Sequence, residues 1–477
     1  MISKLRLLGL WTRRFRLTVP FLAISGFAAS LPAVDGLTRN AINARYEALA
    51  GVNTALGGSP VDVALNPANL SVTKGKKLEF GLGNSSIYNR YQDRFLDPNP
   101  DYVYSNDKKS TVQAPAPYVA LKLPVTDTID YGVALYIPGG AIGGVEEITR
   151  NTPNGQSLNQ WAGLNLPDPI GNSKQIKETN SNQFAVVKLV NGISFRFGKL
   201  SLGASLEAVY GTQKLNQKYY DLTGTLEIPG QGYYYESSKK AFTIGGVVGL
   251  NYALTERFRV AYSYQTHSSI PLNGHYRIGL NDPTYYRSTG VSYNFDLPEK
   301  HSLGFSYGPE NLKVAVDLVY TNYGSYLRKA NQKLEDPWLP TPLGNIADAD
   351  AHLNFRSQAG FLIGLEHKLG DSWVYRLGYS YNTLAIKSNG LGGTTGGFFS
   401  LNHVFAGGIG YVFDKWSLDL GISYNGPKNH VTGGKGTDWD LSHSIKTGPA
   451  QFNSAGYSYS AEASILAVNI GATKSFD

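Results

Sequence analysis

Short segments in which apolar and polar residues alternate recur along most of the chain, between residues 77 and 476. In one of them, Leu200, Leu202 and Leu206 share one face, while Ser201 and Glu207 lie on the other. Fourteen such segments occur, and none has a charged residue at the apolar positions of its core. A period of two predicts β-strands, and a charge-free apolar face predicts contact with lipid opposite a lumen. We therefore expect a transmembrane β-barrel.

The connections between these segments alternate between short and long. The short connections contain residues that favour turns and fall at 126–128, 198–199, 255–257, 309–311, 370–371 and 414–415. The long connections are polar and run through 87–112, 139–182, 214–239, 270–297, 324–355, 384–397 and 426–455. Outer-membrane barrels combine short periplasmic turns with long external loops and an even number of strands. The fold predicted over residues 76–477 is an all-β, 14-stranded antiparallel barrel with seven long external loops.

The first 33 residues are typical of a secretory signal peptide. Five basic residues and no acidic ones occur here, and an apolar stretch from Leu17 to Ala29 leads to small residues around Ala33. We expect cleavage near Ala33 and delivery to the outer membrane of a Gram-negative type of bacterium. Removal of the five basic residues lowers the formal net charge from +7 to +2. Such a small charge gives no reason to expect a nucleic-acid partner.

Residues 34–75 lack the alternation and are rich in small residues. Eight strands leave an interior that side chains can fill, and sixteen or more leave a water channel. A barrel of fourteen strands should therefore have a bore wide enough to need a plug, unless the protein is an open pore. The predicted lumen faces carry many glycines and alanines, which leaves room for this segment as an N-terminal hatch inside the barrel.

The sequence gives little support for catalysis or a cofactor. The chain has no Cys, and its eight His are scattered without the spacing of a metal site. Residues 304–308 match the Gly-x-Ser-x-Gly pattern of serine hydrolases, but they alternate within a strand instead of forming a turn into a helix. We expect a protein that is not an enzyme and has no metal and no cofactor.

Two stretches carry a resemblance to a known family. Residues 48–70 read ALAGVNTALGGSPVDVALNPANL, and residues 297–326 read LPEKHSLGFSYGPENLKVAVDLVYTNYGSY. With the strand count of fourteen, the chain resembles the FadL-type outer-membrane transporters of long-chain fatty acids and other hydrophobic compounds. The resemblance implies that Asn66, Pro67 and Ala68 form the hatch motif. It also implies that external loops capture a hydrophobic ligand, that the hatch shifts, and that the ligand leaves sideways through a gap at a kinked third strand.

The third strand has residues that suit such a kink. It meets Pro138, Gly139 and Gly140, where proline removes a hydrogen-bond donor and glycine tolerates a bulge. The other possibility is that the strand ends there and a long loop begins.

Lumen-side cations could contact a ligand carboxylate. By alternation the candidates are Lys313, Arg376 and Arg259, together with Lys188 and Arg196, while Asp317 could simply pair with Lys313. The expected partners are fatty acids, detergents and hydrocarbons, with lipid and lipopolysaccharide around a monomer. The alternatives are an adhesin or receptor, and a general diffusion porin, built on the same scaffold.

Overall fold

The computed structural model describes most of the chain. The described residues are 39–152, 155–228, 233–237, 241–278, 287–327, 329–334, 340–341, 344–345, 349–352, 355–385, 402–433 and 457–476. The expected signal peptide, residues 1–33, lies outside them. None of the helices in the described ranges has the length and hydrophobicity needed to cross a membrane.

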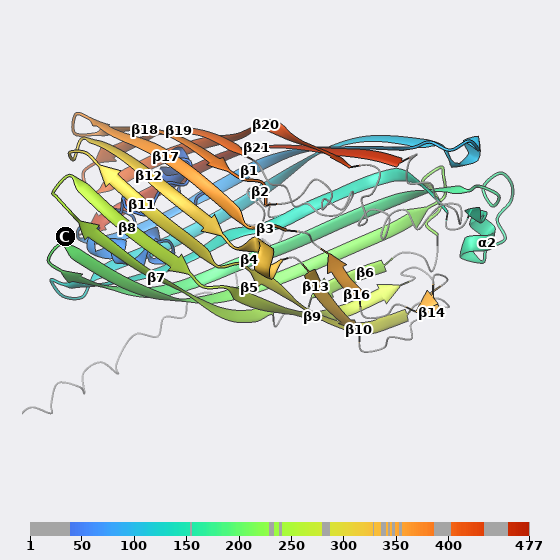
Figure 1. Cartoon of the computed structure of the whole chain (residues 1–477), viewed down its shortest axis with the longest axis horizontal. Helices are drawn as coiled ribbons and strands as arrows, with labels where there is room; N and C mark the ends of the chain where they lie inside the picture. The colour runs from blue at the N-terminus through green and yellow to red at the C-terminus, as the bar shows by residue number, and fades with distance from the viewer. Residues whose placement is uncertain are drawn as a thin grey trace, which may run out of the picture.

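Fourteen antiparallel strands form a closed barrel, which confirms the predicted fold class (Figure 1). Each strand pairs with its neighbour, and the last strand pairs with the first from Lys76↔Phe476 to Phe95↔Tyr457. The strands are β1 (Lys76–Phe95), β2 (Tyr104–Pro124), β3 (Ile129–Asn151), β4 (Gln175–Phe197), β5 (Leu200–Tyr220), β7 (Phe242–Ala253), β8 (Phe258–Gln265), β11 (Lys300–Tyr307), β12 (Leu312–Thr321), β17 (Gln358–Leu369), β18 (Trp373–Asn382), β19 (His403–Phe413), β20 (Trp416–Gly433) and β21 (Tyr457–Phe476).

The two faces of the wall differ as the alternation predicts. Leu206 on β5 is 60% exposed on the outside, whereas the next residue, Glu207, is completely buried in the bore. Rings of His and Tyr also gather on the outside, where His301 Nδ1 lies 2.8 Å from the Tyr262 hydroxyl. Apolar side chains exposed on a barrel wall are stable because lipid, not water, surrounds them.

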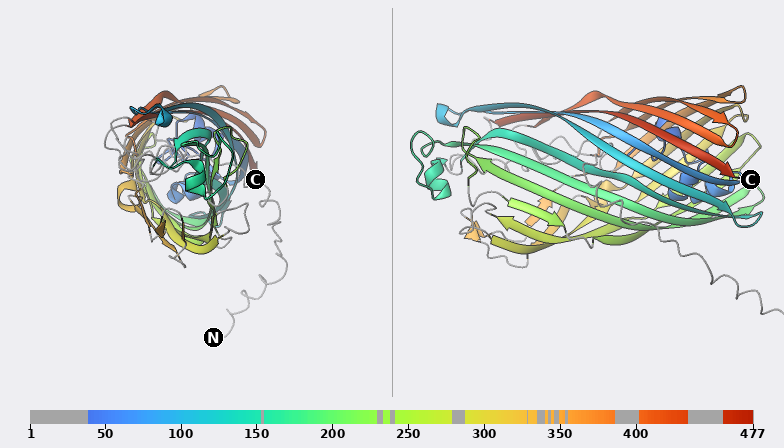
Figure 2. Two further views of the ribbon diagram at one scale, coloured as in Figure 1. Left: turned by 90° about the vertical axis from the view of Figure 1, so that its right-hand side faces the viewer. Right: turned by 180° about the vertical axis from the view of Figure 1, so that it is seen from behind.

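All six predicted short connections are tight turns at one end of the barrel. Gly198 and Gly370 have φ values of 60° and 62°, which glycine adopts without steric cost. The opposite end carries the longer connections, and the right-hand view in Figure 2 places the C-terminus at the short-turn end.

The long connections are shorter than predicted, because several strands continue well beyond the apolar segments. β1 and β2 fill most of 87–112, and β3 and β4 fill parts of 139–182. The segment 270–297, predicted to be a loop, is largely β9 (Ser268–Ile278) and β10 (Arg287–Leu297), which pair with each other. Outside the bilayer both faces of a strand can be polar, so the alternation that revealed the strands disappears while backbone pairing continues.

Further short elements lie among the long connections. β6 (Tyr233–Ser237) extends the wall beside β5 and β9, and β13 (Lys329–Leu334) pairs with β16 (Ala349–His352). The remaining elements are η4 (Pro100–Tyr102), α2 (Leu158–Ala162), α3 (Tyr323–Tyr326), β14 (Pro340–Thr341) and β15 (Gly344–Asn345). Most of the predicted loops 384–397 and 426–455 lies outside the described residues.

Residues 39–75, which we call the inner segment, lie inside the barrel near the short-turn end (Figure 2). The segment contains α1 (Ala44–Ala48), η2 (Pro60–Ala64) and η3 (Pro67–Ser71). α1 packs against β18 to β21, and η3 packs against β3, β4, β5 and β7. The segment therefore touches the wall on opposite sides of the bore.

Candidate functional site

Glycines of the wall make room for the inner segment. A Cβ added at Gly378 of β18 would lie 2.3 Å from the carbonyl carbon of Leu49. Across the bore, a Cβ added at Gly203 of β5 would lie 2.3 Å from the amide nitrogen of Ala68. Side chains at these positions would collide with the backbone of the segment. Other wall glycines whose added Cβ would lie within 3.1 Å of this segment are Gly83, Gly132, Gly192, Gly249, Gly304, Gly364, Gly408 and Gly421.

The predicted Asn66-Pro67-Ala68 motif forms the start of η3 and binds the wall. Asn66 is fully buried, and its Oδ1 accepts a hydrogen bond of 3.2 Å from the Ala68 amide. Its Nδ2 donates to the Thr54 carbonyl at 2.9 Å and to the Leu250 carbonyl of β7 at 3.3 Å. Pro67 occupies the first helical position, where a missing N–H has no cost. The motif thus joins two turns of the inner segment to one strand.

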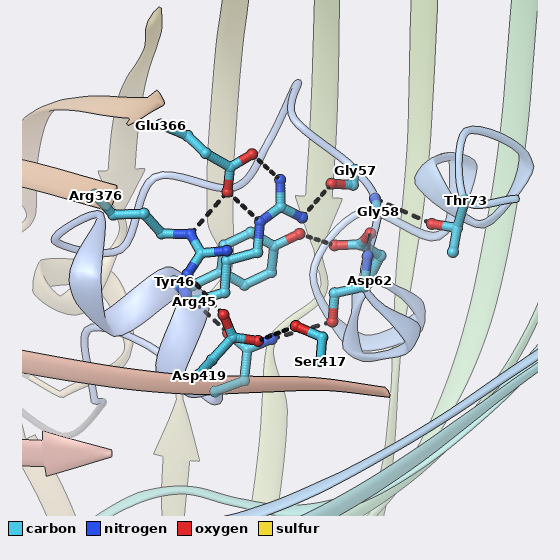
Figure 3. A network of polar contacts seen from close by, with 12 residues as sticks. Arg45, Tyr46, Gly57, Gly58, Asp62, Thr73, Glu366, Arg376, Ser417 and Asp419 are labelled. Atoms are coloured by element: carbon cyan, nitrogen blue, oxygen red, sulfur yellow. Dashed lines mark hydrogen bonds and ion pairs between the residues drawn. The ribbon is translucent and has the colours of Figure 1, made fainter. Parts of the chain in front are cut away.

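Arg45 ties α1 to the wall through buried carboxylates (Figure 3). Its Nε and Nη2 donate to the two oxygens of Glu366 on β17, at 2.7 and 2.9 Å. Arg376 on β18 donates to Glu366 at 2.8 Å and to Asp419 on β20 at 2.7 Å. Two cations and two anions therefore balance one another, which offsets the cost of taking them out of water. The sequence analysis did not single out Arg45.

A second polar group lies on the other side of α1. The Tyr46 hydroxyl donates to Asp62 at 2.5 Å, and Asn43 Nδ2 donates to Glu79 of β1 at 2.7 Å. The Ser59 hydroxyl also donates to Glu79. Burial raises the pKa of the Asp62 carboxyl to about 7, although hydrogen bonds from Tyr46 and Ser59 act in the opposite direction. These bonds connect two parts of the inner segment, at Asn43 and Ser59, to the first strand, and they join Tyr46 to Asp62 within the segment.

The candidate carboxylate contacts Lys313, Arg376 and Arg259 all face the bore close to the short-turn end. Lys313 lies opposite Glu366 in the β12–β17 register, and Arg376 is already bound to two carboxylates. Arg259 Nη1 donates to Asn251 Oδ1 at 3.3 Å. All three lie beside the inner segment, not in the part of the bore nearer the long connections.

Two further predicted lumen cations also have protein partners. Lys188 Nζ donates to Glu207 Oε2 at 2.6 Å, and Arg196 donates to the Ser71 carbonyl.

Asp317 binds the inner segment and not Lys313, the partner that alternation suggested. Its Oδ2 accepts hydrogen bonds from the Asn53 amide at 2.8 Å and from the amide and hydroxyl of Thr54 at 3.0 and 2.9 Å. The carboxylate thus satisfies backbone donors that would otherwise be buried without a partner.

An apolar cluster lies in the bore on the side of the inner segment nearer the long connections. Its members come from β4, β5, β9, β10, α3 and the connections near them, and are Phe184, Val186, Val209, Ala241, Ile270, Leu272, Val291, Phe295, Leu297, Tyr323, Leu327, Phe355 and Ala385. Phe184 and Val186 lie opposite Ala141 and Gly139 in the β3–β4 register. The cluster therefore begins directly beside the predicted kink.

The pairing of β2 with β3 stops next to this cluster. The ladder runs from Pro124↔Asp130 to Tyr118↔Tyr136 and ends there, although β2 stays paired with β1 as far as Phe95↔Tyr104. β3 stays paired with β4, but with a register shift between Tyr136 and Gly139 that adds one residue to β3. We call the stretch beyond the end of the β2–β3 ladder, residues 107–117 of β2 and 137–148 of β3, the window.

Two sets of contacts border the window. On one side the Arg39 amide of the inner segment donates to the Pro138 carbonyl at 2.8 Å. At the far end Asn106 rejoins the strands, because its Nδ2 donates to the Thr149 carbonyl at 3.0 Å and its Oδ1 accepts from the Thr149 amide at 2.7 Å. Next to this bond the buried Arg150 pairs with Asp93 of β1 and, at 3.2 Å, with Glu178 of β4. The sequence analysis missed these residues because it assigned them to loops.

The first four residues of the Gly-x-Ser-x-Gly match lie in β11, where Ser306 donates to the carbonyl of Ala55 in the inner segment at 3.1 Å. Among the described residues, no three His, Asp or Glu side chains gather in a way that could hold a metal ion.

Comparison with known proteins gives one consistent result. Residues 172–473 match a family model described as outer membrane protein transport protein (OMPP1/FadL/TodX). A Pseudomonas aeruginosa FadL homologue superposes with a TM-score of 0.66 at 16% identity, covering 93% of this chain and 100% of the other. The Pseudomonas putida toluene transporter TodX gives 0.60 at 17% identity, covering 93% and 100%. The Ralstonia pickettii toluene transporter TbuX gives 0.55 at 16% identity, covering 92% and 99%. A comparison with curated protein sequences finds no match.

Proposed function

Because the chain belongs to the outer membrane protein transport family (OMPP1/FadL/TodX), we propose that it carries hydrophobic compounds inward across the outer membrane by a lateral route. The ligand enters the bore from the long-loop end, passes the apolar cluster and leaves through the window between β2 and β3 into the bilayer. The ligand class is long-chain fatty acids or hydrocarbons.

The end of the β2–β3 ladder at Tyr118↔Tyr136 is the observation that carries this proposal. A gap in backbone pairing inside a barrel leaves backbone N–H and C=O groups without ladder partners, which is energetically costly in a membrane. Such a gap is therefore expected only where it has a function. The apolar cluster supports the same route, since each buried methylene of a ligand is worth about 0.8 kcal/mol. A path from the cluster through the window into lipid keeps an alkyl chain out of water.

The inner segment acts as the hatch in this proposal. It fills the bore beside the window, and its Arg39 amide is bonded to the kink at Pro138. A shift of the segment would break this bond and change the width of the path. The bonds of Arg45, Asn66 and Asp317 to the wall hold the rest of the segment in place.

Lys313, Arg376 and Arg259 have a structural role in this route. A ligand that leaves through the window does not reach the part of the bore where they lie. We therefore assign them to the charge balance between the inner segment and the wall, not to a ligand carboxylate.

A cross-link across the window tests the lateral exit, and the absence of native Cys makes the experiment clean. Cysteines replace Ala116 on β2 and Gly139 on β3, which would face each other in the bore if the β2–β3 ladder continued past the one-residue bulge of β3. A bifunctional thiol reagent that joins them should block cellular uptake of radiolabelled oleate, and a cleavable spacer should restore it on reduction.

The matched control joins Val119 and Leu135, which already face each other within the ladder. This cross-link should leave uptake unchanged, because it adds a bond where the strands are already paired. Full uptake in the cross-linked window variant would contradict the lateral route.

A further inference from the structure

Besides the kink in β3, the window has an unusual sequence feature on the facing strand, β2. Residues Pro115 and Pro117 lie on β2, in the stretch where pairing with β3 has stopped. Both remain in the β1–β2 ladder, opposite Asn84 and Leu82. A proline is tolerated within a ladder only where its nitrogen points away from the paired neighbour.

The direction of these two nitrogens follows from the register. The Val125 amide, at the turn of the β2–β3 hairpin, donates to the Ile129 carbonyl at 2.8 Å, so it points toward β3. Successive amides in a strand point to alternate sides, and β2 keeps a continuous register with its partners between residues 104 and 124. Pro115 and Pro117 are separated from Val125 by even numbers of residues, so their nitrogens also point toward β3.

Two consecutive donors that β3 would need are therefore missing from β2. The bulge at Pro138 alone shifts β3 by one residue against β4, but it removes no donor from β2. A bulged strand can resume pairing after the bulge, as β3 does with β4 from Gly139 onward. The β2–β3 ladder does not resume, and the first β2 residue without a ladder partner on β3 is Pro117 itself.

We infer that Pro115 and Pro117 are positioning residues that keep the window open, in the way that prolines protect the edge strand of a sheet from further pairing. This inference rests on the proposed lateral exit and names the residues that make it permanent. The inward-facing neighbours Ala114 and Ala116 are small and buried, so the edge presents no large side chain to the opening.

The test restores the donors with the double substitution Pro115→Val and Pro117→Val. Disulfide formation between cysteines at positions 116 and 139 reports the distance between the strands, and oleate uptake reports transport. With the prolines present, we expect a low disulfide yield and full uptake. With valines, the yield should rise at least fivefold and uptake should fall by a similar factor.

The two readouts separate the inference from the proposed function. If the disulfide yield does not rise in the valine variant, the prolines do not hold the window open and the inference is wrong. If the yield rises and uptake stays normal, the inference stands and the lateral route is wrong. Pro124→Val is the matched control, because it lies at the turn end of the β2–β3 ladder, and it should change neither readout. The single variant Pro117→Ala, checked for the heat-modified migration of a folded barrel, repeats the test if the double variant does not assemble.

Discussion

Buried polar side chains carry most of the specific contacts between the inner segment and the wall. Asn66, Arg45 and Asp317 each make several hydrogen bonds at once, and these bonds are largely shielded from water. Removing one partner of such a group leaves the other buried and unsatisfied, which costs more than the bond itself contributes. Substitutions here should therefore disturb the docking of the segment without unfolding the barrel, whose ladders do not depend on them.

Replacing Asn66 with Leu should weaken this docking. The change removes the cap of η3, at about 1 kcal/mol, and one of two side-chain donors to the Thr54 carbonyl, which keeps the 3.1 Å hydrogen bond from Asn69 Nδ2. Leu is also wider at the point where Asn66 touches Gly249 of β7. We expect uptake of radiolabelled oleate to drop severalfold, with normal heat-modified migration. Wild-type uptake would show that the motif has no part in transport.

Neutralising Lys313 and Arg376 together distinguishes a structural role from a ligand contact. In Lys313→Met/Arg376→Met, Glu366 and Asp419 lose a buried partner, at a cost of about 3–5 kcal/mol. If the cations hold the inner segment, uptake of a fatty acid and of toluene should change by the same factor. A selective loss of fatty acid uptake would instead place a ligand carboxylate beside them.

Arg90→Met is the control for that experiment. Its pair with Asp107 is exposed to solvent and lies on the extended part of β1, so its loss should leave the uptake of both compounds unchanged.

The sequence predicted a role for some of these residues and not for others, because only some of their contacts are local in the chain. The Asn-Pro-Ala triplet is local, and its cap forms within three residues, so the chain itself displays it. Arg45 and Glu366 are 321 residues apart, and nothing in either neighbourhood indicates the other. The pairing of Lys313 with Asp317 was wrong because alternation gives the face of a side chain but not which backbone donors the inner segment brings to it.

The sequence predicts the strands correctly where they cross the bilayer. In that region one face of each strand contacts lipid and is apolar, as Leu202 and Leu206 of β5 show. Beyond the bilayer, water accepts polar residues on both faces, so Asn89 and Arg90 continue β1 without any alternation to reveal it. Asn106 and Arg150, which border the far end of the window, fall in this region, so the hydrophobic pattern does not reveal them.

Two glycines on paired strands allow the fit between strand and inner segment to be tested. Gly378→Val on β18 would bring a side chain against the backbone of Leu49 and Ala50, whereas at Gly407 on β19 an added Cβ would meet only Leu377 and Arg376, the nearest at 3.5 Å. We expect Gly378→Val to displace α1 and to raise channel activity in a planar bilayer. Gly407→Val should behave like the wild type, and equal behaviour of the two variants would show that the segment tolerates a bulkier wall.

For the whole molecule, the contents of the bore decide between a transporter and a diffusion porin. A fourteen-stranded barrel is wide enough to conduct ions if it is empty, but the inner segment touches the wall from β3 through β7 and from β18 through β21. A cavity lined by Asn53, Asp317 and Ser380 lies between the inner segment and the wall. Ion flow through this end of the bore should therefore be weak.

Deleting residues 39–73 from the mature chain tests this directly. The barrel keeps all of its ladders in this variant, because the closing pair β1–β21 begins at Lys76. The intact protein should be almost silent in a planar bilayer, and the deletion should give large, steady, ohmic currents. Steady conductance of the intact protein would favour the porin. Silence of both proteins would mean that the inner segment is not what closes the bore.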